Sequence, residues 1–596
     1  MRLAAAKGGV PADAPLTELQ RDDGQWVMAA KNYASTRFSG LAQIDTNNVG
    51  NLGLAWTFAT GRLRGHEAAP IVAGSTMYVV TPHPNALYAL DLARAGELKW
   101  KYEPPVDPAA EGVACCDVVN RGAAYAAGKV FFATLDNQVA AVDAETGAEV
   151  WRVKVGDINI GETMTAAPLV VKDKVLVGNS GGELGVRGWL KALNVATGAV
   201  EWTAWGTGPD RDVLIDENFR PFYPQYRGRD LGVTTWPPEQ WKIGGATGWG
   251  WMSYDPELDL IYHGTANPGV WNPALRPGDN LWSSSVIARD PDDGSARWAY
   301  QFTPHDEHDY DGVLENILVD MPINGQTRKL LIRPERNGFM YIMDRTNGQV
   351  LSAEPYGPVT WATRIDLQTG RPVKVDSKGT GNRLATNVCP ASPGMKDWPP
   401  SAYSPKTGLL YIPMNHLCMD YQGVEANYIA GTPYVGANVQ MYSAEGRGNQ
   451  EHRGTFKAWN PVTQREVWAI KEKFPVWSGA VVTAGDVVFY GTMDRWFKAI
   501  NARTGQELWR FRAGSGIIGQ PVTYLGPDGR QYVAILAGVG GWAGVAALGV
   551  LPENDPTIGL GFPTAVPDLP EHTAQGGMLY VFALPGPAPT AQDTAR

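Results

Sequence analysis

The eleven residues AVDAETGAEVW, from Ala141 to Trp151, follow the pattern A-x-D/N-x-x-T-x-x-x-x-W. The pattern returns with the same spacing in ALNVATGAVEW (192–202), AWNPVTQREVW (458–468) and AINARTGQELW (499–509). Looser copies are ALDLARAGELKW (89–100), ARDPDDGSARW (288–298) and MDRTNGQVLS (343–352), which lacks the Trp. Self-similarity of this kind indicates a repeat architecture, which overrides the usual estimate of domain number from chain length.

Each copy predicts a strand, a tight turn carried by Asp or Asn and usually Gly, and a second strand that opens with Trp. Most copies follow another short β-rich run, such as KVFFATL (129–135) or DVVFYGTM (486–493), so a unit contains four strands. Seven units, with an eighth built from LAWTFATG (54–61) and MLYVFAL (578–584), predict an all-β, eight-bladed β-propeller with blades of roughly 75 residues. A β-sandwich is the alternative, but sandwiches do not repeat a Trp-bearing turn so regularly.

We expect one propeller domain over residues 1–584, because no low-complexity linker divides the chain. Pairing of the first and last strands would close the ring. The Pro-rich segment PGPAPTAQDTAR (585–596) is expected to be a disordered tail. The repeated Trp residues are expected to pack between blades and to donate their N–H groups to backbone carbonyls.

Composition excludes several classes of protein. With 596 residues, 44% apolar and 19% charged, the chain can bury a large core. Its net charge of -10 and the lack of a Lys/Arg run argue against nucleic acid and anionic membranes as partners. No stretch approaches the ~20 apolar residues of a membrane span. The opening MRLAAAKGG is too short for a complete secretory signal, which indicates a cytosolic protein or a mature, trimmed form.

The four cysteines are Cys115, Cys116, Cys389 and Cys418. None forms a C-x-x-C motif, which excludes covalent haem and a zinc ribbon. The even count permits two disulfides in an oxidising compartment, and four free thiols in the cytosol are the alternative.

The run TPHDEHDYDGV (303–313) places two carboxylates, Asp309 and Asp311, two residues apart. If the run is extended, both side chains point the same way and can converge on one ion or one proton. One carboxylate could then act as a general base while the other holds a hard cation. A solvated acidic turn is the alternative.

The Trp repeats occur together with GHEAAP (65–70), ACCDVVNRG (114–122), SGGELGVRG (180–188), TGWGW (247–251), GTANPGVWN (264–272) and TPHDEHDYDGV. This set resembles the pyrroloquinoline quinone (PQQ) alcohol dehydrogenases along nearly the whole chain. In detail it is most similar to their lanthanide-dependent methanol dehydrogenase branch.

The resemblance implies how PQQ would be held. Cys115 and Cys116 match a disulfide between neighbours that lies against one face of the quinone, and Trp249 matches the indole on the other face. Arg121 matches a partner of a PQQ carboxylate, and Arg336 matches the arginine at the reactive quinone oxygens. Further polar and rim positions are Glu67, Thr165, Ser180, Gly181, Gly182, Thr247, Asp397, Trp477 and Trp542.

The same resemblance implies a metal site. Glu183, Asn267 and Asp309 match the ligands common to the family, and Asp311 matches the additional ligand of the lanthanide-dependent members, where calcium-dependent members carry a small apolar residue. Three carboxylates balance a trivalent ion of the lanthanum, cerium or neodymium class, whereas two would suit calcium, the alternative metal. Trp271 matches a wall of the substrate cavity.

The implied reaction is oxidation of methanol, or of another small primary alcohol, to the aldehyde. Asp309 would take the hydroxyl proton while a hydride passes to PQQ, and electrons would then pass to a soluble cytochrome c. The family works in the periplasm, where Cys389 and Cys418 match a second disulfide, and a homodimer is expected. Two residues depart from the family pattern: His308 stands where Trp is common, and Gln464 replaces the Gly of the repeat.

Two alternatives remain open. The first is a broad-specificity or calcium-dependent PQQ alcohol dehydrogenase, in which Asp311 is incidental. The second is a cofactor-free propeller scaffold, which would have no reason to keep Cys115, Cys116, Trp249, Arg336, Glu183 and Asp309 together.

Overall fold

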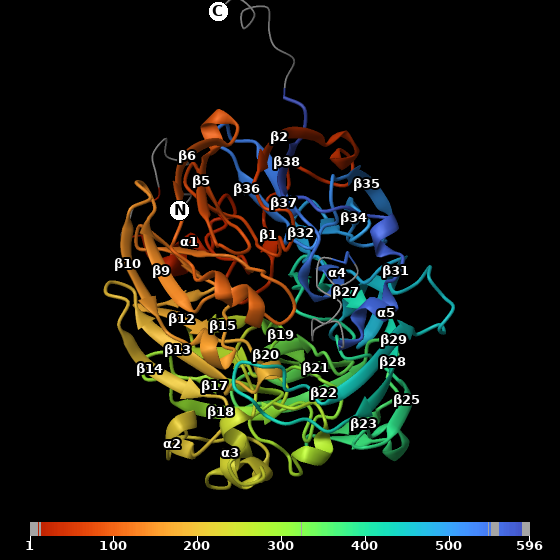
Figure 1. Cartoon of the computed structure of the whole chain (residues 1–596). Coiled ribbons are helices and arrows are strands. Elements are labelled where there is room, and N and C mark those ends of the chain that lie inside the picture. The colour runs from red at the N-terminus through yellow and green to blue at the C-terminus, as the bar shows by residue number, and fades with distance from the viewer. Residues whose placement is uncertain (1–9, 11–13, 324, 546–547, 550–559, 587–596) are drawn as a thin grey trace, which may run out of the picture.

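The computed structural model describes residues 10, 14–323, 325–545, 548–549 and 560–586. Most of the predicted tail, from residue 587 onward, lies outside these residues. Within them, the chain forms eight antiparallel sheets of four strands, one of which gains a fifth, parallel strand at its edge, and the sheets are arranged around a common centre (Figure 1). The predicted all-β propeller is therefore confirmed, and the sheets are its blades.

Four blades come from residues 71–301 and use consecutive strands. They are β3–β6 (Ile71–Ala73, Thr76–Val80, Leu87–Asp91, Glu97–Tyr102), β7–β10 (Ala124–Ala126, Lys129–Ala133, Gln138–Asp143, Glu149–Lys154), β11–β14 (Leu169–Val171, Lys174–Gly178, Trp189–Asn194, Val200–Trp205) and β15–β18 (Met252–Asp255, Leu260–Gly264, Ser285–Arg289, Ala296–Gln301).

The next three blades are β19–β22 (Ile317–Ile323, Gln326–Pro334, Phe339–Asp344, Gln349–Pro355), β26-β27-β30-β31 (Ala402–Ser404, Leu409–Asn415, Gly454–Asn460, Arg465–Glu472) and β32–β35 (Val481–Thr483, Val487–Gly491, Trp496–Asn501, Glu507–Arg512), with β1 (Phe38–Ser39) added beside β32. The last blade joins β36 (Val522–Leu525), β37 (Gln531–Ala537) and β38 (Met578–Ala583) to β2 (Gly53–Ala59).

The pairing of β2 with β38 closes the ring as predicted. Trp56 lies opposite Val581 in this antiparallel pair, and Figure 1 shows red and blue strands side by side there. Closure leaves no long unpaired edge inside the ring, which is how propellers protect their sheets.

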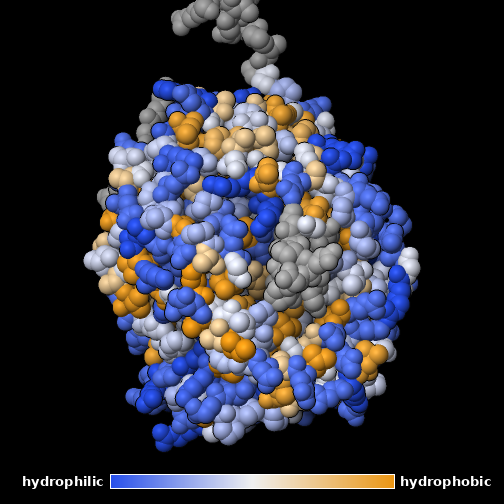
Figure 2. Space-filling view, in the orientation of Figure 1, coloured by the Kyte–Doolittle hydropathy of each residue, from blue (hydrophilic) through white to orange (hydrophobic). Residues whose placement is uncertain are grey.

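Short elements decorate this frame. Strands outside the blades are β23 (Ala362–Asp366), β24 (Arg371–Lys374), β25 (Leu384–Val388), β28 (Leu417–Gly423) and β29 (Ala437–Ser443). The α-helices within the described residues are α1 (Leu16–Leu19), α2 (Asp210–Val213), α3 (Leu231–Thr234), α4 (Gly541–Val545) and α5 (Phe562–Ala565). In the described part of the chain, no helix has the length and apolar character needed to cross a membrane. On the face seen in Figure 2, apolar residues lie in small groups among hydrophilic ones.

The repeated Trp residues pack as predicted. Trp151, in the last strand of its blade, lies against the turn glycine of the next blade, where a Cβ atom on Gly198 would come within 2.7 Å of the indole ring. The Trp151 Nε1 group donates to the carbonyl of Val195 at 3.1 Å. An indole packs on a turn glycine in the same way for Trp56 and Gly96, Trp100 and Gly147, Trp202 and Gly294, Trp298 and Gly348, and Trp468 and Gly505. The predicted N–H donation to a carbonyl recurs at Trp202, Trp298 and Trp468, whereas Trp100 Nε1 has no partner among the described residues.

The interface between the β19–β22 blade and the β26-β27-β30-β31 blade lacks both the Trp and the turn glycine that pack together at the other interfaces named above. Ser352 occupies the Trp position, opposite Ile342, and Gln464 occupies the glycine position of the following turn. Without an indole against the turn there is room for a side chain, so the two departures belong together. Gln464 nevertheless has a φ of 55°, in the left-handed region that favours glycine.

Gln464→Gly is expected to raise the free energy of unfolding by about 0.5 to 1 kcal/mol. The substitution removes the left-handed strain of an L-residue and a buried amide oxygen, Oε1, that has no partner among the described residues. Denaturant midpoints would measure the gain. Gly505→Ala is the matched control: its Cβ would lie 2.8 Å from Trp468, so that variant is expected to lose stability. A loss in Gln464→Gly would contradict the strain argument.

The blade topology also places the site. In a four-stranded antiparallel blade, the loop between strands two and three and the connection to the next blade leave from the same end. Most of the residues selected from the sequence lie on these two kinds of loop: Glu183 follows β12, Arg336 follows β20, and Asp309 lies between β18 and β19. Segments far apart in the chain therefore meet on one face of the ring.

Candidate active site

A cavity on that face brings the predicted residues together. The predicted residues that line it are Glu67, Cys115, Cys116, Arg121, Thr165, Ser180, Gly181, Glu183, Trp249, Trp271, Asp309, Asp311, Arg336, Asp397, Trp477 and Trp542. Gly182, Thr247 and Asn267 lie just behind the lining, because a Cβ on Gly182 would sit 3.8 Å from both the Thr247 hydroxyl and the Asn267 amide oxygen.

Sequence reasoning missed three lining residues, Val119, Trp398 and Leu560. Trp398 directly follows Asp397, and its backbone N–H donates to the Asp397 carboxylate at 2.6 Å. Its ring lies 4.9 Å from the Arg121 guanidinium, so it helps to hold that cation. The position of Trp398 directly after Asp397, a predicted rim residue, could have pointed to it. With 22 Trp residues in the chain, however, such a position does not single one out.

One wall of the cavity differs from the prediction. Cys115 and Cys116 are free thiols in the structure, in place of the predicted disulfide. Adjacent Cα atoms lie about 3.8 Å apart across a trans peptide, which is shorter than the spacing of ordinary disulfides. The hydrogen bond between the thiols, together with burial, raises the pKa of Cys115 well above its usual value. The wall therefore consists of two neutral sulfur groups.

Arg121 forms a cationic end of the cavity. Its Nη1 donates to the Thr165 hydroxyl at 2.7 Å, and Nη2 lies 3.0 Å from a carboxylate oxygen of Glu67. The guanidinium also lies 4.8 Å from the centre of the Trp249 ring. A buried arginine held this way presents a fixed, planar set of donors that suits a carboxylate-bearing ligand.

The opposite end is rich in carboxylates. Asp309 and Asp311 are both buried, and both converge on Arg336: Nη2 lies 3.1 Å from Asp309, and Nη1 pairs with Asp311. The backbone N–H of Asn267 donates to Asp311 at 2.7 Å. The two carboxylates do converge, but the run is not a strand, because Asp309 has a φ of 67°.

The charges at this end do not balance without a further cation. Glu183, Asp309 and Asp311 carry three negative charges when ionised, and Arg336, which Asp397 also approaches at 3.5 Å, supplies one positive charge. Burial, together with the repulsion between these neighbouring carboxylates, raises the pKa of Asp311 to about 7 and that of Asp309 well above its usual value. Arg336 was predicted to contact the quinone oxygens of PQQ. In the structure its guanidinium forms ion pairs with Asp309, Asp311 and Asp397.

The donor set fits a hard cation. Carboxylate and amide oxygens are the ligands that such ions prefer, and Asp309 Oδ1 is buried with no hydrogen-bond partner among the described residues. An ion bound there would favour the ionised carboxylates and release Arg336 toward the cavity. The residues present therefore match both the charge and the chemistry of a trivalent metal site.

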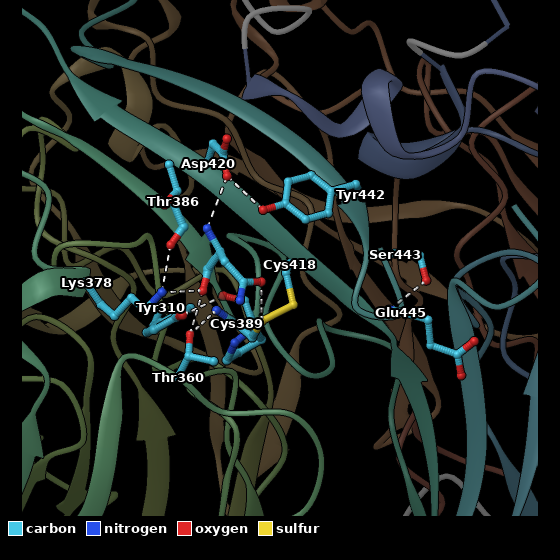
Figure 3. Close-up of a disulfide and its surroundings, with 12 residues drawn as sticks. Tyr310, Thr360, Lys378, Thr386, Cys389, Cys418, Asp420, Tyr442, Ser443 and Glu445 are labelled. Atoms are coloured by element: carbon cyan, nitrogen blue, oxygen red, sulfur yellow. Dashed lines mark hydrogen bonds between the residues drawn. A yellow bond between two sulfur atoms is a disulfide. The ribbon is translucent and has the colours of Figure 1, made fainter. Parts of the chain in front are cut away.

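The carboxylate loop is anchored through the second predicted disulfide, Cys389–Cys418, which is confirmed (Figure 3). The Tyr310 hydroxyl donates to the carbonyl of Pro390, next to Cys389, at 2.6 Å. Tyr310 lies between Asp309 and Asp311 in sequence and is fully buried. The segment at the disulfide thereby holds Tyr310 in place, and with it the loop that carries Asp309 and Asp311.

Tyr310→Phe is expected to lower the free energy of unfolding by about 1 to 3 kcal/mol, because it leaves the buried Pro390 carbonyl without its donor. Affinity for a lanthanide ion should fall as well, since the loop loses its anchor. Denaturation and metal titration would measure the two effects. Tyr403→Phe is the control, because Tyr403 is also buried but its hydroxyl makes no hydrogen bond within the described chain. Equal stability of both variants would show that the anchor is unimportant.

His308, the departure from the family pattern, is a packing residue. Its ring lies 5.2 Å from that of Tyr310 and 6.1 Å from that of Trp361. Its Nε2 lies 2.9 Å from the carbonyl of Lys378, and burial lowers its pKa. A neutral imidazole therefore fills the aromatic cluster under the loop and adds no charge beside Asp309.

Three comparisons place this geometry among known proteins. The profile of the PQQ-dependent glucose/ethanol/alcohol dehydrogenase β-propeller domain matches residues 26–360 and 448–533. The chain is 54% identical over 578 residues to a lanthanide-dependent methanol dehydrogenase of Methylacidiphilum fumariolicum, covering 96% of this chain and 94% of the relative. It is 46% identical over 597 residues to subunit 1 of a methanol dehydrogenase [cytochrome c] of Methylorubrum extorquens, covering 98% and 95%. The solved structure of a europium-containing methanol dehydrogenase superposes with a TM-score of 0.94 at 53% identity, covering 96% of this chain and 100% of that one.

Proposed function

Since the chain belongs to the family of PQQ-dependent glucose, ethanol and alcohol dehydrogenases with a β-propeller domain, we propose that it is a lanthanide-dependent methanol dehydrogenase. It oxidises methanol and other small primary alcohols to the aldehyde and passes the electrons to cytochrome c. The observation that carries the choice of metal is the third buried or half-buried carboxylate, Asp311, which joins Asp309 and Glu183 at one end of the cavity.

When bound, PQQ supplies the hydride acceptor and the lanthanide ion supplies a Lewis acid. Within the proposal, Arg121 binds a carboxylate of the cofactor, and Trp249 and the sulfur wall of Cys115 and Cys116 flank its two faces. The polar and rim contacts come from Glu67, Thr165, Ser180, Gly181, Gly182, Thr247, Asp397, Trp477 and Trp542.

Asp309 acts as the general base in this proposal. Its unpartnered Oδ1 is free to accept the hydroxyl proton of the alcohol, while Oδ2 is held by Arg336. Glu183, Asn267 and Asp311 complete the ligand set with Asp309. A base in this place must be ionised, so its raised pKa has to be lowered by the cation next to it.

Trp271 limits the size of the substrate. Its ring meets Trp542 at 6.4 Å and is stacked at 6.5 Å on Tyr421, so three aromatic side chains form a rigid apolar wall. A wall of this kind favours methanol over longer alcohols, because extra methylene groups have no space.

Dye-linked methanol oxidation tests the proposal. Metal-stripped protein is loaded with PQQ and assayed with lanthanum, cerium or calcium. Activity with a lanthanide, and at least tenfold less with calcium, is the expected result. Equal activity with calcium would leave a PQQ alcohol dehydrogenase but remove the role of Asp311, and comparable kcat/KM for longer alcohols would remove the preference for methanol. Lack of PQQ uptake would instead revive the scaffold alternative.

The proposal extends to the setting of the enzyme. A single propeller over residues 1–584 is supported by the pairing of β2 with β38, which makes each end of the chain depend on the other. The Cys389–Cys418 disulfide fits the oxidising periplasm. We expect a homodimer, and light scattering on the purified protein would measure its mass.

A further inference from the structure

A second group of potential metal ligands lies away from the cavity, where the hairpin formed by β28 and β29 leaves the propeller. It consists of His416, Glu445 and His452, and their ligand atoms all lie within 4.8 Å of one another. His416 precedes β28, Glu445 follows β29 and His452 precedes β30. The three residues therefore join both ends of the hairpin to the blade beneath it.

Backbone contacts fix the positions of these residues. The N–H of Ala444 donates to the carbonyl of His416 at 2.9 Å, which sets the two ends of the hairpin side by side. Ser443 accepts from the N–H of Glu445 at 3.2 Å and donates to the carbonyl of His452 at 2.6 Å. Ser443 pairs with Leu417, the neighbour of Cys418, and Figure 3 draws Ser443 and Glu445 among the surroundings of the disulfide.

The side chains are already gathered. The imidazole rings of His416 and His452 are stacked with centroids 3.9 Å apart, and His452 Nδ1 lies 2.7 Å from Glu445 Oε1. The other ring nitrogen of His452, Nε2, lies 3.0 Å from the Thr455 hydroxyl, so one of its two contacts has to open for an ion. Two imidazoles and a carboxylate are a ligand set that zinc accepts, with a water molecule in the fourth position.

We propose that His416, Glu445 and His452 bind a divalent transition-metal ion of the zinc class at the base of the β28–β29 hairpin. Binding requires the two rings to turn out of their parallel stack so that their lone pairs converge. It also requires Lys471, whose Nζ lies 2.7 Å from Glu445 Oε1, to release that oxygen. Lys471 is exposed at the surface, so its ammonium group can return to water at little cost.

An ion at this place would act on the cavity through the hairpin. The Tyr421 hydroxyl, on β28, donates to the carbonyl of Trp271 at 3.1 Å. At the far end of the hairpin, the N–H of Tyr434 donates to the carbonyl of Glu183 at 2.6 Å. The hairpin thus spans from the new site to the substrate wall and the carboxylate end, and closing its base restricts its motion over both.

Zinc chloride titrated into the PQQ- and lanthanide-loaded protein, followed by calorimetry, tests the assignment. The wild type is expected to bind one equivalent that His416→Ala, His452→Gln and Glu445→Gln each weaken at least tenfold. His572→Ala is the matched control, since it removes a histidine that lies beside a carboxylate, Asp568, without a second imidazole. Lack of zinc binding by the wild type, or equal affinity in all variants, would overturn the proposal.

Two measurements on the wild type avoid any question of variant folding. With Cu²⁺ in place of zinc, electron paramagnetic resonance is expected to show coupling to two imidazole nitrogens; coupling to one or none contradicts the assigned ligands. Hydrogen exchange is expected to slow in β28 and β29 when zinc is added. Unchanged exchange in both strands would reject the closing of the hairpin base.

Discussion

Asp309→Asn should lower kcat for methanol by about a thousandfold while PQQ and the lanthanide ion remain bound. Asparagine keeps the shape of the side chain but cannot accept the proton that the unpartnered Oδ1 is free to take. It is also suited to the left-handed backbone of this position, where φ is 67° and alanine would add strain. Steady-state kinetics, the absorbance of released PQQ and metal analysis together measure the outcome.

Glu472→Gln is the control for loss of a buried carboxylate. Glu472 pairs with Lys498 at 2.7 Å and is not among the residues that line the cavity, so its replacement should reduce stability and leave kcat unchanged. If Asp309→Asn loses PQQ or the ion together with activity, Asp309 is chiefly a structural ligand. If kcat is retained with both groups bound, another residue is the base.

The fold could be predicted because the repeats record it locally. The turn glycine Gly147 and the indole of Trp151 belong to one short sequence motif, and each of them packs against a neighbouring blade. The pairing of β2 with β38 was predictable for the same reason, since only one incomplete unit remained at each end. The relation between Ser352 and Gln464 was not predicted, because the two residues were read as separate departures and belong to neighbouring blades.

The candidate site could be predicted only through the family resemblance. Spacing alone placed Asp309 and Asp311 on one side of an extended run, whereas the observed convergence depends on a left-handed residue and on Arg336. The ion pairs of Arg336 follow from burial, which a sequence does not display. Trp398 was missed because its role arises from contact with Arg121, which lies 277 positions earlier in the numbering (398 minus 121).

Asp311→Ala should reduce lanthanide-supported kcat/KM by on the order of a thousandfold, with a much smaller effect on folding. Removing this carboxylate leaves Glu183 and Asp309, whose two charges suit a divalent ion better than a trivalent one. Arg336 keeps Asp309 at 3.1 Å and Asp397 at 3.5 Å, so it is not left as an unpaired buried charge. The free energy of unfolding should therefore fall by less than about 3 kcal/mol.

The ratio of activities with lanthanum and calcium separates the role of Asp311 from a general loss of function. If Asp311 serves specifically to bind a trivalent ion, Asp311→Ala is expected to lose lanthanum-supported activity and to keep, or gain, calcium-supported activity. An equal loss with both metals would mean that the variant mainly disturbs Arg336, which Asp311 also contacts. Full activity with lanthanum would show that Glu183, Asn267 and Asp309 suffice, and the charge argument for the third carboxylate would then be wrong.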